Sequence, residues 1–177
     1  MSKTVHVFAN SMITGQQGEA EIRNYLLSRG NVAQVIDVSD NPAYQEKDID
    51  FLVYQTSGAL TKTELKTDTY DKNFFYETLS NIERGTPGCM EKTEADCLCY
   101  YYVNLDTLYV IDLPALRKWF HSIKQESWVK RKTLTNAVGK GHFYTSEGYV
   151  FSRQDFEEKF PGYWYKVENL SEYSYAA

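Results

Sequence analysis

The sequence predicts an α/β fold in which a central mixed β-sheet is flanked by helices. Two observations predict it. Patterns typical of helices and of strands alternate along the chain, and neither an internal repeat nor a linker rich in Pro, Gly or Ser divides it. With 177 residues, of which 42% are hydrophobic and 24% charged, the chain has the composition of a globular protein with a sizeable core. We therefore treat residues 1–177 as a single domain.

The first part of the chain has the pattern of one helix followed by strands. Residues 1–8 predict a short strand or a leading arm, and the Gly-Gln-Gln-Gly segment at 15–18 predicts a break before the helix. The helix carries Ile22 and Leu26 in its apolar stripe and ends at Gly30. Extended runs then follow at 32–36, 49–54 and 60–66, the last two joined by a turn as a hairpin.

The second part mixes both patterns. The predicted elements are, in order, a helix at 73–79, a loop at 84–88, a helix running into a strand at 95–103, and strands at 108–111 and 148–151. Between the last two strands, Asp112 is placed to cap a helix that has Pro114 in its first turn. Ser152, with Asp155 three residues on, opens a short final helix.

Charge, cysteine content and hydropathy restrict the class of protein. The formal net charge of −5 argues against coating nucleic acid by bulk positive charge, although acids that hold a metal ion present a cation to phosphate. The cysteines Cys89, Cys97 and Cys99 do not suggest a disulfide framework, which favours a cytoplasmic location. No apolar run approaches the roughly 20 residues that cross a bilayer, so we expect no membrane partner.

Two acids and a lysine in the expected hairpin carry the chemistry. Asp50 opens the first strand, and Glu64 and Lys66, two residues apart in the second, project to the same face. If the strands pair, Asp50 can lie beside Glu64, and carboxylates so close are unfavourable unless a cation lies between them. Mg²⁺, for which Mn²⁺ substitutes, takes such oxygen ligands, and the Leu65 carbonyl is a further candidate. The Lys66 ammonium can orient or help to deprotonate an attacking water and offset transition-state charge.

These residues resemble a known family. Asp50 and Glu64-x-Lys66, with a helical glutamate upstream, look like the PD-(D/E)XK nuclease superfamily, which includes many restriction endonucleases and the archaeal Holliday-junction resolvases. The similarity to a small phage and bacterial subset extends over residues 18–111, through Asn73 with Glu77, the Arg-Gly-Thr-Pro-Gly loop at 84–88, and Ala-Asp before paired tyrosines. One departure is Ile49, which stands where the proline that names the motif precedes the aspartate.

The resemblance implies a restriction-endonuclease-like core and a metal-dependent deoxyribonuclease that acts endonucleolytically on DNA. It assigns catalytic roles to Glu19, Asp50, Glu64, Lys66 and Glu77, with Glu19, Asp50, Glu64 and Leu65 at the metal. Glu19 corresponds to the glutamate that opens the first helix in resolvase-like relatives, and counting back from Gly30 favours it over Glu21. Such relatives often cut two strands as dimers, so a homodimer is an open expectation.

DNA would also need contacts outside the catalytic centre. The candidates are Arg84 in its glycine-proline loop and the run Lys130, Arg131 and Lys132, with Trp128 available to stack on a base. A solvated basic turn is the alternative interpretation of that run. The three histidines are scattered without a triad pattern, and the cysteine spacing lacks the four ligands of a zinc site.

A second function from a different class remains open. A nuclease-like fold can serve as a binding or inhibitor protein, for example a phage-type factor that blocks or recruits a host protein. Tyrosines expected at the surface would suit such an interface, namely Tyr100, Tyr101, Tyr102, Tyr163 and Tyr165. Action on RNA in place of DNA is a third interpretation.

Overall fold

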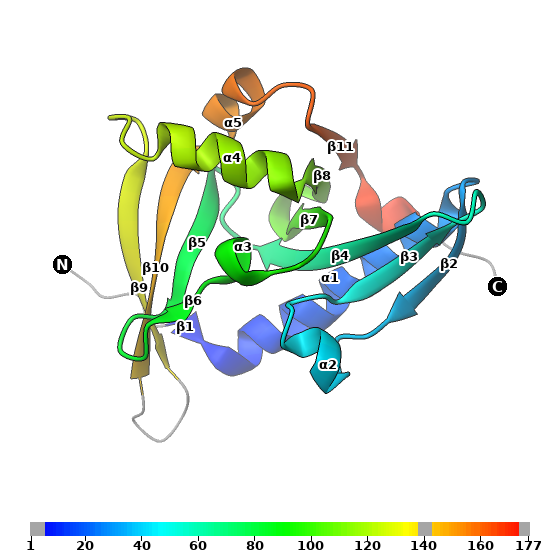
Figure 1. Cartoon of the computed structure of the whole chain (residues 1–177), viewed down its shortest axis with the longest axis horizontal. Coiled ribbons are helices and arrows are strands. Elements are labelled where there is room, and N and C mark those ends of the chain that lie inside the picture. Colours follow the sequence, from blue (N-terminus) through cyan, green and yellow to red (C-terminus); the bar gives the residue numbers. More distant parts are fainter. Residues whose placement is uncertain (1–5, 138–142, 174–177) are drawn as a thin grey trace.

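The strands form two sheets in the computed structural model, which describes residues 6–137 and 143–173 (Figure 1). The larger sheet has the strand order β11-β8-β7-β4-β3-β2. Its strands are β2 (Val32–Asp37), β3 (Phe51–Gln55), β4 (Leu60–Asp68), β7 (Cys97–Tyr102), β8 (Thr107–Asp112) and β11 (Trp164–Glu168). Because β4 and β7 run parallel while their other neighbours are antiparallel, this sheet is mixed. The prediction of an α/β fold with a mixed sheet flanked by helices is confirmed.

The smaller sheet was not predicted as a separate unit. Its order is β1-β9-β10-β5-β6, with β1 (His6–Val7), β9 (Lys130–Ala137), β10 (Phe143–Ser152), β5 (Asn73–Asn81) and β6 (Thr86–Pro87). The prediction of a helix at 73–79 is wrong, because this segment is strand β5. Phe74 and Tyr76, two residues apart, are both buried in the core, which is the period of a strand. Residues 1–5 of the expected leading arm lie outside the described residues.

Helices cover both faces of the larger sheet. On one face, α1 (Phe8–Ser28) packs Ile22 and Leu26 against Phe51 of β3 and Leu108 of β8. The opposite face contributes to a second, aromatic-rich core that also includes α4 (Leu113–Ile123), α5 (Arg153–Lys159) and the smaller sheet. Two short helices, α2 (Pro42–Gln45) and α3 (Cys89–Lys92), and the 3₁₀ turns η1 (Val103–Leu105) and η2 (Leu170–Glu172) complete the fold. Within the described residues, no helix combines the length and the apolar character needed to cross a membrane.

The expected break at residues 15–18 is absent, because α1 continues through it. Gly18 is the point at which the helix crosses β4. A Cβ atom added there would lie 2.2 Å from Cγ2 of Thr67, so only glycine allows this approach. The glycine that suggested a helix start in the sequence therefore serves close packing between helix and sheet. Glu19, the next residue, lies in the middle of α1 rather than at its beginning.

Several local predictions are confirmed. β3 and β4 form the expected antiparallel hairpin, with Phe51 opposite Thr63. The Asp112 carboxylate accepts from the Ala115 N–H at the start of α4, and the Ser152 hydroxyl accepts from the Asp155 N–H at the start of α5. Two predictions are wrong. Residues 97–102 are strand β7 without a preceding helix at 95, and Tyr100, Tyr101 and Tyr102 are buried, whereas Tyr163 and Tyr165 are exposed.

Candidate active site

Asp50 lies where the pairing between β3 and β4 ends. Its backbone N–H donates to the Thr63 carbonyl at 3.0 Å, and its carboxylate Oδ2 accepts from the Leu65 N–H at 2.8 Å. The Asp50 carboxylate therefore accepts the N–H that a backbone carbonyl would accept if the pairing with β4 continued, and it lies beside β4. Because the N–H and C=O of a strand residue point to the same side, the Leu65 carbonyl is also directed toward this point. The Asp50 carboxylate and the Leu65 carbonyl therefore lie together at the open end of the hairpin.

Glu64 supplies the second carboxyl group. It is buried on β4, and its side chain is hydrogen-bonded to that of Asp50. Burial and the neighbouring Asp50 carboxylate raise the pKa of Glu64 well above its usual value. Burial also raises the pKa of Asp50, although the hydrogen bonds from Leu65 and Glu64 oppose this shift. The two buried acids lie side by side, in an environment where a bound cation would favour their ionised forms.

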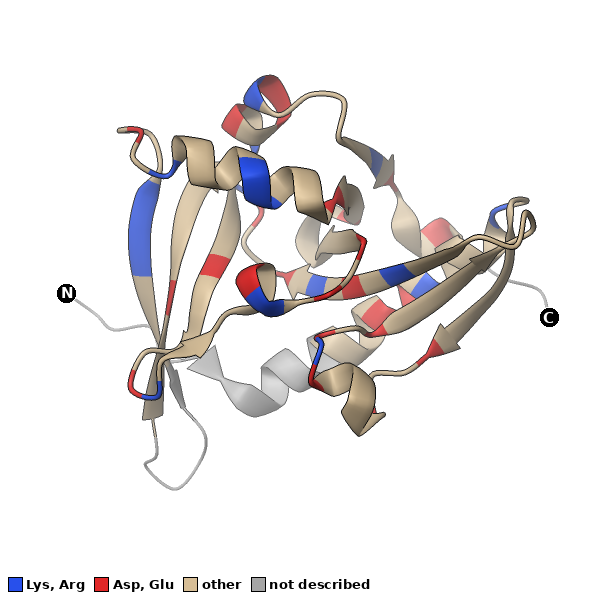
Figure 2. Ribbon diagram, viewed as in Figure 1, with Lys and Arg blue, Asp and Glu red and all other residues tan. Residues whose placement is uncertain are grey.

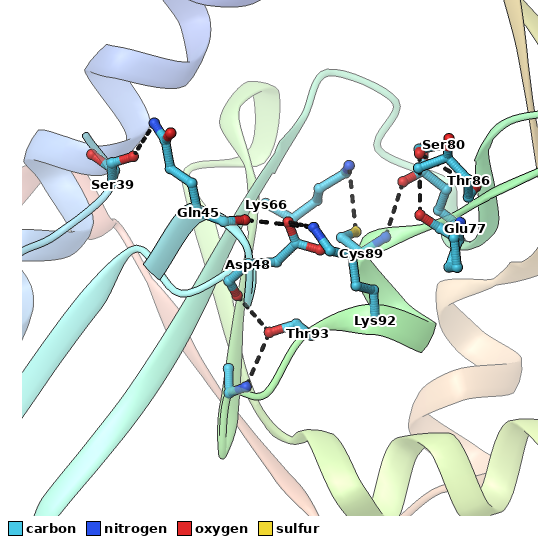
Figure 3. A network of polar contacts seen from close by, with 12 residues as sticks. Ser39, Gln45, Asp48, Lys66, Glu77, Ser80, Thr86, Cys89, Lys92 and Thr93 are labelled. Carbon is cyan, nitrogen blue, oxygen red and sulfur yellow. Dashed lines mark hydrogen bonds and ion pairs between the residues drawn. The ribbon is translucent and has the colours of Figure 1, made fainter. Parts of the chain in front are cut away.

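Lys66 lies beside the acid pair on the same face of β4 as Glu64. These two residues are opposite Leu98 and Tyr100 of β7, which both belong to the aromatic-rich core. The Lys66 Nζ atom lies 3.7 Å from the Cys89 Sγ atom (Figure 3). The Cys89 sulfur and the carboxylates of Glu77 and Glu64 together outweigh burial and raise the pKa of Lys66. Lys66 therefore carries its positive charge next to the acids.

Glu77 approaches the same point from the smaller sheet. It lies on β5, and its Oε2 atom accepts from the Cys89 N–H at 3.3 Å. Burial raises the pKa of the Cys89 thiol to about 12, although the neighbouring Lys66 opposes the rise. No spacing or motif in the sequence selects Cys89 as part of this site. Its one signal is its position directly after the Arg-Gly-Thr-Pro-Gly loop.

Glu19, on α1, lies near Asp50. Burial raises its pKa, and so do the carboxylates of Asp50, Asp37 and Asp40 in turn. Its neighbour Glu21 has a different environment, because its Oε2 atom lies 2.5 Å from the Tyr101 hydroxyl. Glu19 thus adds a third carboxyl group near Asp50, from the opposite face of the sheet to Glu64.

The oxygen atoms near Asp50 are of the types that bind hard cations, but the side chains described there are not arranged as a formed metal site. Within residues 6–137 and 143–173, no three His, Cys, Asp or Glu side chains are grouped so as to hold a metal ion. The oxygen atoms of Asp50 and Glu64 and the Leu65 carbonyl are nonetheless the ligand types that Mg²⁺ and Mn²⁺ prefer. Two carboxyl groups in direct contact require a proton or a cation between them, so these residues fit a divalent ion.

The basic candidates lie apart from the acids. Arg84 is exposed between β5 and β6, and Lys130, Arg131 and Lys132 are exposed on β9 of the smaller sheet (Figure 2). The Arg131 guanidinium is paired with the Glu147 carboxylate of β10, and the Lys132 amine lies over the Tyr70 ring. The basic run is therefore a strand, not a turn. Trp128, which was expected to be available to stack on a base, is partly buried, and its ring packs against Trp119 and Phe151.

Comparison of the chain with protein-family models, with curated proteins and with solved structures finds no match in any of the three.

Proposed function

We propose that the chain is a metal-dependent deoxyribonuclease that hydrolyses phosphodiester bonds endonucleolytically, on a restriction-endonuclease-like core. One observation carries the proposal. Asp50 and Glu64 lie beside each other at the open end of a hairpin, with Lys66 on the same face as Glu64, Glu77 close to Lys66, and Glu19 near Asp50 from the opposite face of the sheet. A buried acid pair next to a fixed cation is an arrangement typical of functional sites, because it is costly for stability.

Each residue has a role in this reaction. Asp50, Glu64, the Leu65 carbonyl and Glu19 would hold Mg²⁺ or Mn²⁺, which when bound polarises the scissile phosphate and lowers the pKa of its water. Asp50 is held in place by the Leu65 N–H, so its orientation is fixed before substrate arrives. Lys66, being protonated, acts as a donor that stabilises negative charge on the phosphate rather than as a proton acceptor.

Substrate would reach this centre along the exposed basic residues. Lys130 on β9 and Arg84 are exposed and would approach phosphate groups, whereas the Lys132 amine lies over the Tyr70 ring and Arg131 is paired with Glu147. Such contacts bind the backbone without reading its sequence. We therefore expect cleavage with little sequence preference.

A supercoiled plasmid incubated with Mg²⁺ or Mn²⁺ tests the proposal, because endonucleolytic cleavage yields nicked and linear forms. We expect Glu64→Gln and Lys66→Met each to lower the rate at least about 100-fold. Glu147→Gln is the matched control, since Glu147 is equally buried but lies on β10. An intact plasmid with the wild-type protein, or equal rates for all variants, would reject the nuclease. Labelled RNA in the same reaction distinguishes the two nucleic acids.

A binding role is the second candidate. The exposed Tyr163 and Tyr165 line a shallow hollow together with Asp96, Asp112 and Trp164. Exposed tyrosines are common in protein interfaces. An inert wild-type protein in the plasmid assay would favour this role, although the burial of Tyr100, Tyr101 and Tyr102 removes most of the expected surface.

A further inference from the structure

We propose that Cys89 is a positioning residue that holds the Lys66 ammonium in its working orientation, with Glu77 fixing Cys89 in turn. This inference rests on the proposed nuclease function. It assigns to α3 and β5 a role in a site whose acids lie on the larger sheet and on α1. Cys89 would not touch substrate and acts only through Lys66.

The contacts link three residues, namely Lys66 on β4 of the larger sheet, Cys89 at the start of α3, and Glu77 on β5 of the smaller sheet. The Glu77 Oε2 atom accepts from the Cys89 N–H at 3.3 Å, and the Cys89 Sγ atom lies 3.7 Å from Lys66 Nζ (Figure 3). The first contact anchors the backbone of Cys89, and the second directs the lysine amine. Because β4 and β5 belong to different sheets, this chain is a direct link between them at the site.

The close approach of α3 to β5 depends on Gly88. A Cβ atom at Gly88 would lie 2.6 Å from the Glu77 carbonyl oxygen and 2.7 Å from Glu77 Cγ. Glycine therefore allows the first turn of α3 to begin directly against β5. This places the Cys89 N–H within reach of the Glu77 carboxylate, and the thiol within reach of Lys66. The loop before α3 thus delivers Cys89 to the lysine.

A thiol suits this task better than an acid would. Sulfur is a weak hydrogen-bond acceptor, and an ammonium group has three donors. One donor toward Cys89 fixes the direction of the side chain, and the others stay available for phosphate. A carboxylate in the same place would form an ion pair and withdraw the charge that the reaction uses. The weak contact orients Lys66 without neutralising it.

Three variants of the full chain separate this role from a packing role. Cys89→Val keeps the approximate shape and removes the acceptor, whereas Cys89→Ser keeps an acceptor. Cys97→Val is the matched control, because Cys97 is also partly buried and its thiol lies beside Cys99 on β7. Plasmid cleavage is measured as kcat and KM, and unfolding midpoints report whether each variant is folded. Cys89→Ala replaces Cys89→Val if the latter does not fold.

We expect Cys89→Val to lower kcat about 10- to 100-fold with KM for DNA unchanged, since a misdirected catalytic group loses rate and not affinity. Cys89→Ser should retain most of kcat, and Cys97→Val all of it. In a Lys66→Met background, Cys89→Val should have no further effect, because its role passes through the lysine.

The outcomes that overturn the inference differ from those that overturn the function. An unchanged kcat in Cys89→Val, or an equal loss with and without Lys66, leaves a nuclease whose lysine does not depend on Cys89. A wild-type protein that cleaves nothing rejects the nuclease itself and this role with it. Failure of Cys89→Ser to retain activity while it remains folded also overturns the role, because its acceptor is present.

Discussion

Two pairs of carboxyl groups meet on the larger sheet, and they are held in opposite ways. Asp50 and Glu64 contact each other directly. Glu21 and Asp106 meet on either side of the Tyr101 hydroxyl, at 2.5 and 2.8 Å from their respective oxygens. The hydroxyl and the N–H of Ser171 also donate to Asp106. One pair is surrounded by neutral donors, whereas the other depends on a proton or on a cation.

The difference separates a structural role from a functional one. Although burial alone would raise it, the hydrogen bonds from Ser171 and Tyr101 hold the pKa of Asp106 below its ordinary value. Burial instead raises the pKa values of both Glu64 and Asp50, and the Asp50 carboxylate raises that of Glu64 further. Buried acids with raised pKa values are typical of functional sites. The Tyr101 pair ties α1 to the sheet, whereas we propose that the Asp50 pair holds a metal ion.

We expect the largest effect on stability and cleavage from a change in α1, the helix that places Glu19 near Asp50 and Glu21 beside Tyr101. Gly18→Ala would place a methyl group 2.2 Å from Cγ2 of Thr67, so α1 must shift away from β4. Overpacking of this kind costs about 1–3 kcal/mol. Urea unfolding should show this loss, and plasmid cleavage should fall because Glu19 moves with the helix. The double variant Gly18→Ala with Thr67→Ser removes the opposing methyl group and should regain most of the stability; no recovery would contradict this packing account.

The next effect comes from the structural pair. Tyr101→Phe removes the hydroxyl that is hydrogen-bonded to both Glu21 and Asp106, and a buried hydrogen bond lost in this way costs about 1–2 kcal/mol. Thermal unfolding measures it, with the exposed Tyr163→Phe as the control that should show no change. Cleavage at a temperature where the protein is folded should be retained. A loss of activity without a loss of stability would place Tyr101 in the functional site instead.

The acid pair was accessible from sequence because its causes are local. Strand alternation puts Glu64 and Lys66 on one face, and a hairpin brings Asp50 beside them. The contact between Lys66 and Cys89 has a distant cause, since α3 is delivered by a loop that packs against β5 of the other sheet. No spacing in the chain encodes that meeting. The sequence therefore predicted the acids and missed the residue that holds the lysine.

The elements of the fold also divide into those that local sequence patterns predict and those that distant contacts decide. The caps at Asp112 and Ser152 act within three residues, and both were predicted. At 73–79 the consecutive Phe74, Phe75 and Tyr76 favour a strand, but pairing with β10, far along the chain, decides it. At 15–18 the glycines resemble a helix break, and only the position of Thr67 reveals why Gly18 is there. Long-range packing determines β5 and the uninterrupted α1, which local sequence patterns do not predict.

A divalent ion should stabilise one pair and not the other. A ligand that binds only the folded state adds RT ln(1 + [L]/Kd), so millimolar Mg²⁺ or Mn²⁺ at pH 8 should raise the free energy of unfolding by about 1–2 kcal/mol. Thermal unfolding with and without the ion measures this. Asp50→Asn should abolish the increase, and Asp106→Asn should leave it intact. An increase that survives in Asp50→Asn would place the ion elsewhere.

The smallest effect distinguishes the pairs by the sign of their pH dependence. The pKa of Glu64 is raised from 4.5, so above that pH the folded chain retains a proton that the unfolded chain has lost, and stability falls as pH rises. Glu64→Gln does not titrate and should be more stable than wild type at pH 8 without metal, by about 1 kcal/mol. The margin should vanish below about pH 4.5.

The pKa of Asp106 is lowered from 3.8, so Asp106→Asn should be less stable at pH 8, with a deficit that shrinks as pH falls below that value. Urea unfolding across this pH range measures both variants. A Glu64→Gln protein that is less stable at pH 8 would mean that Glu64 is compensated in the fold as Asp106 is, and the contrast between the two pairs would be lost.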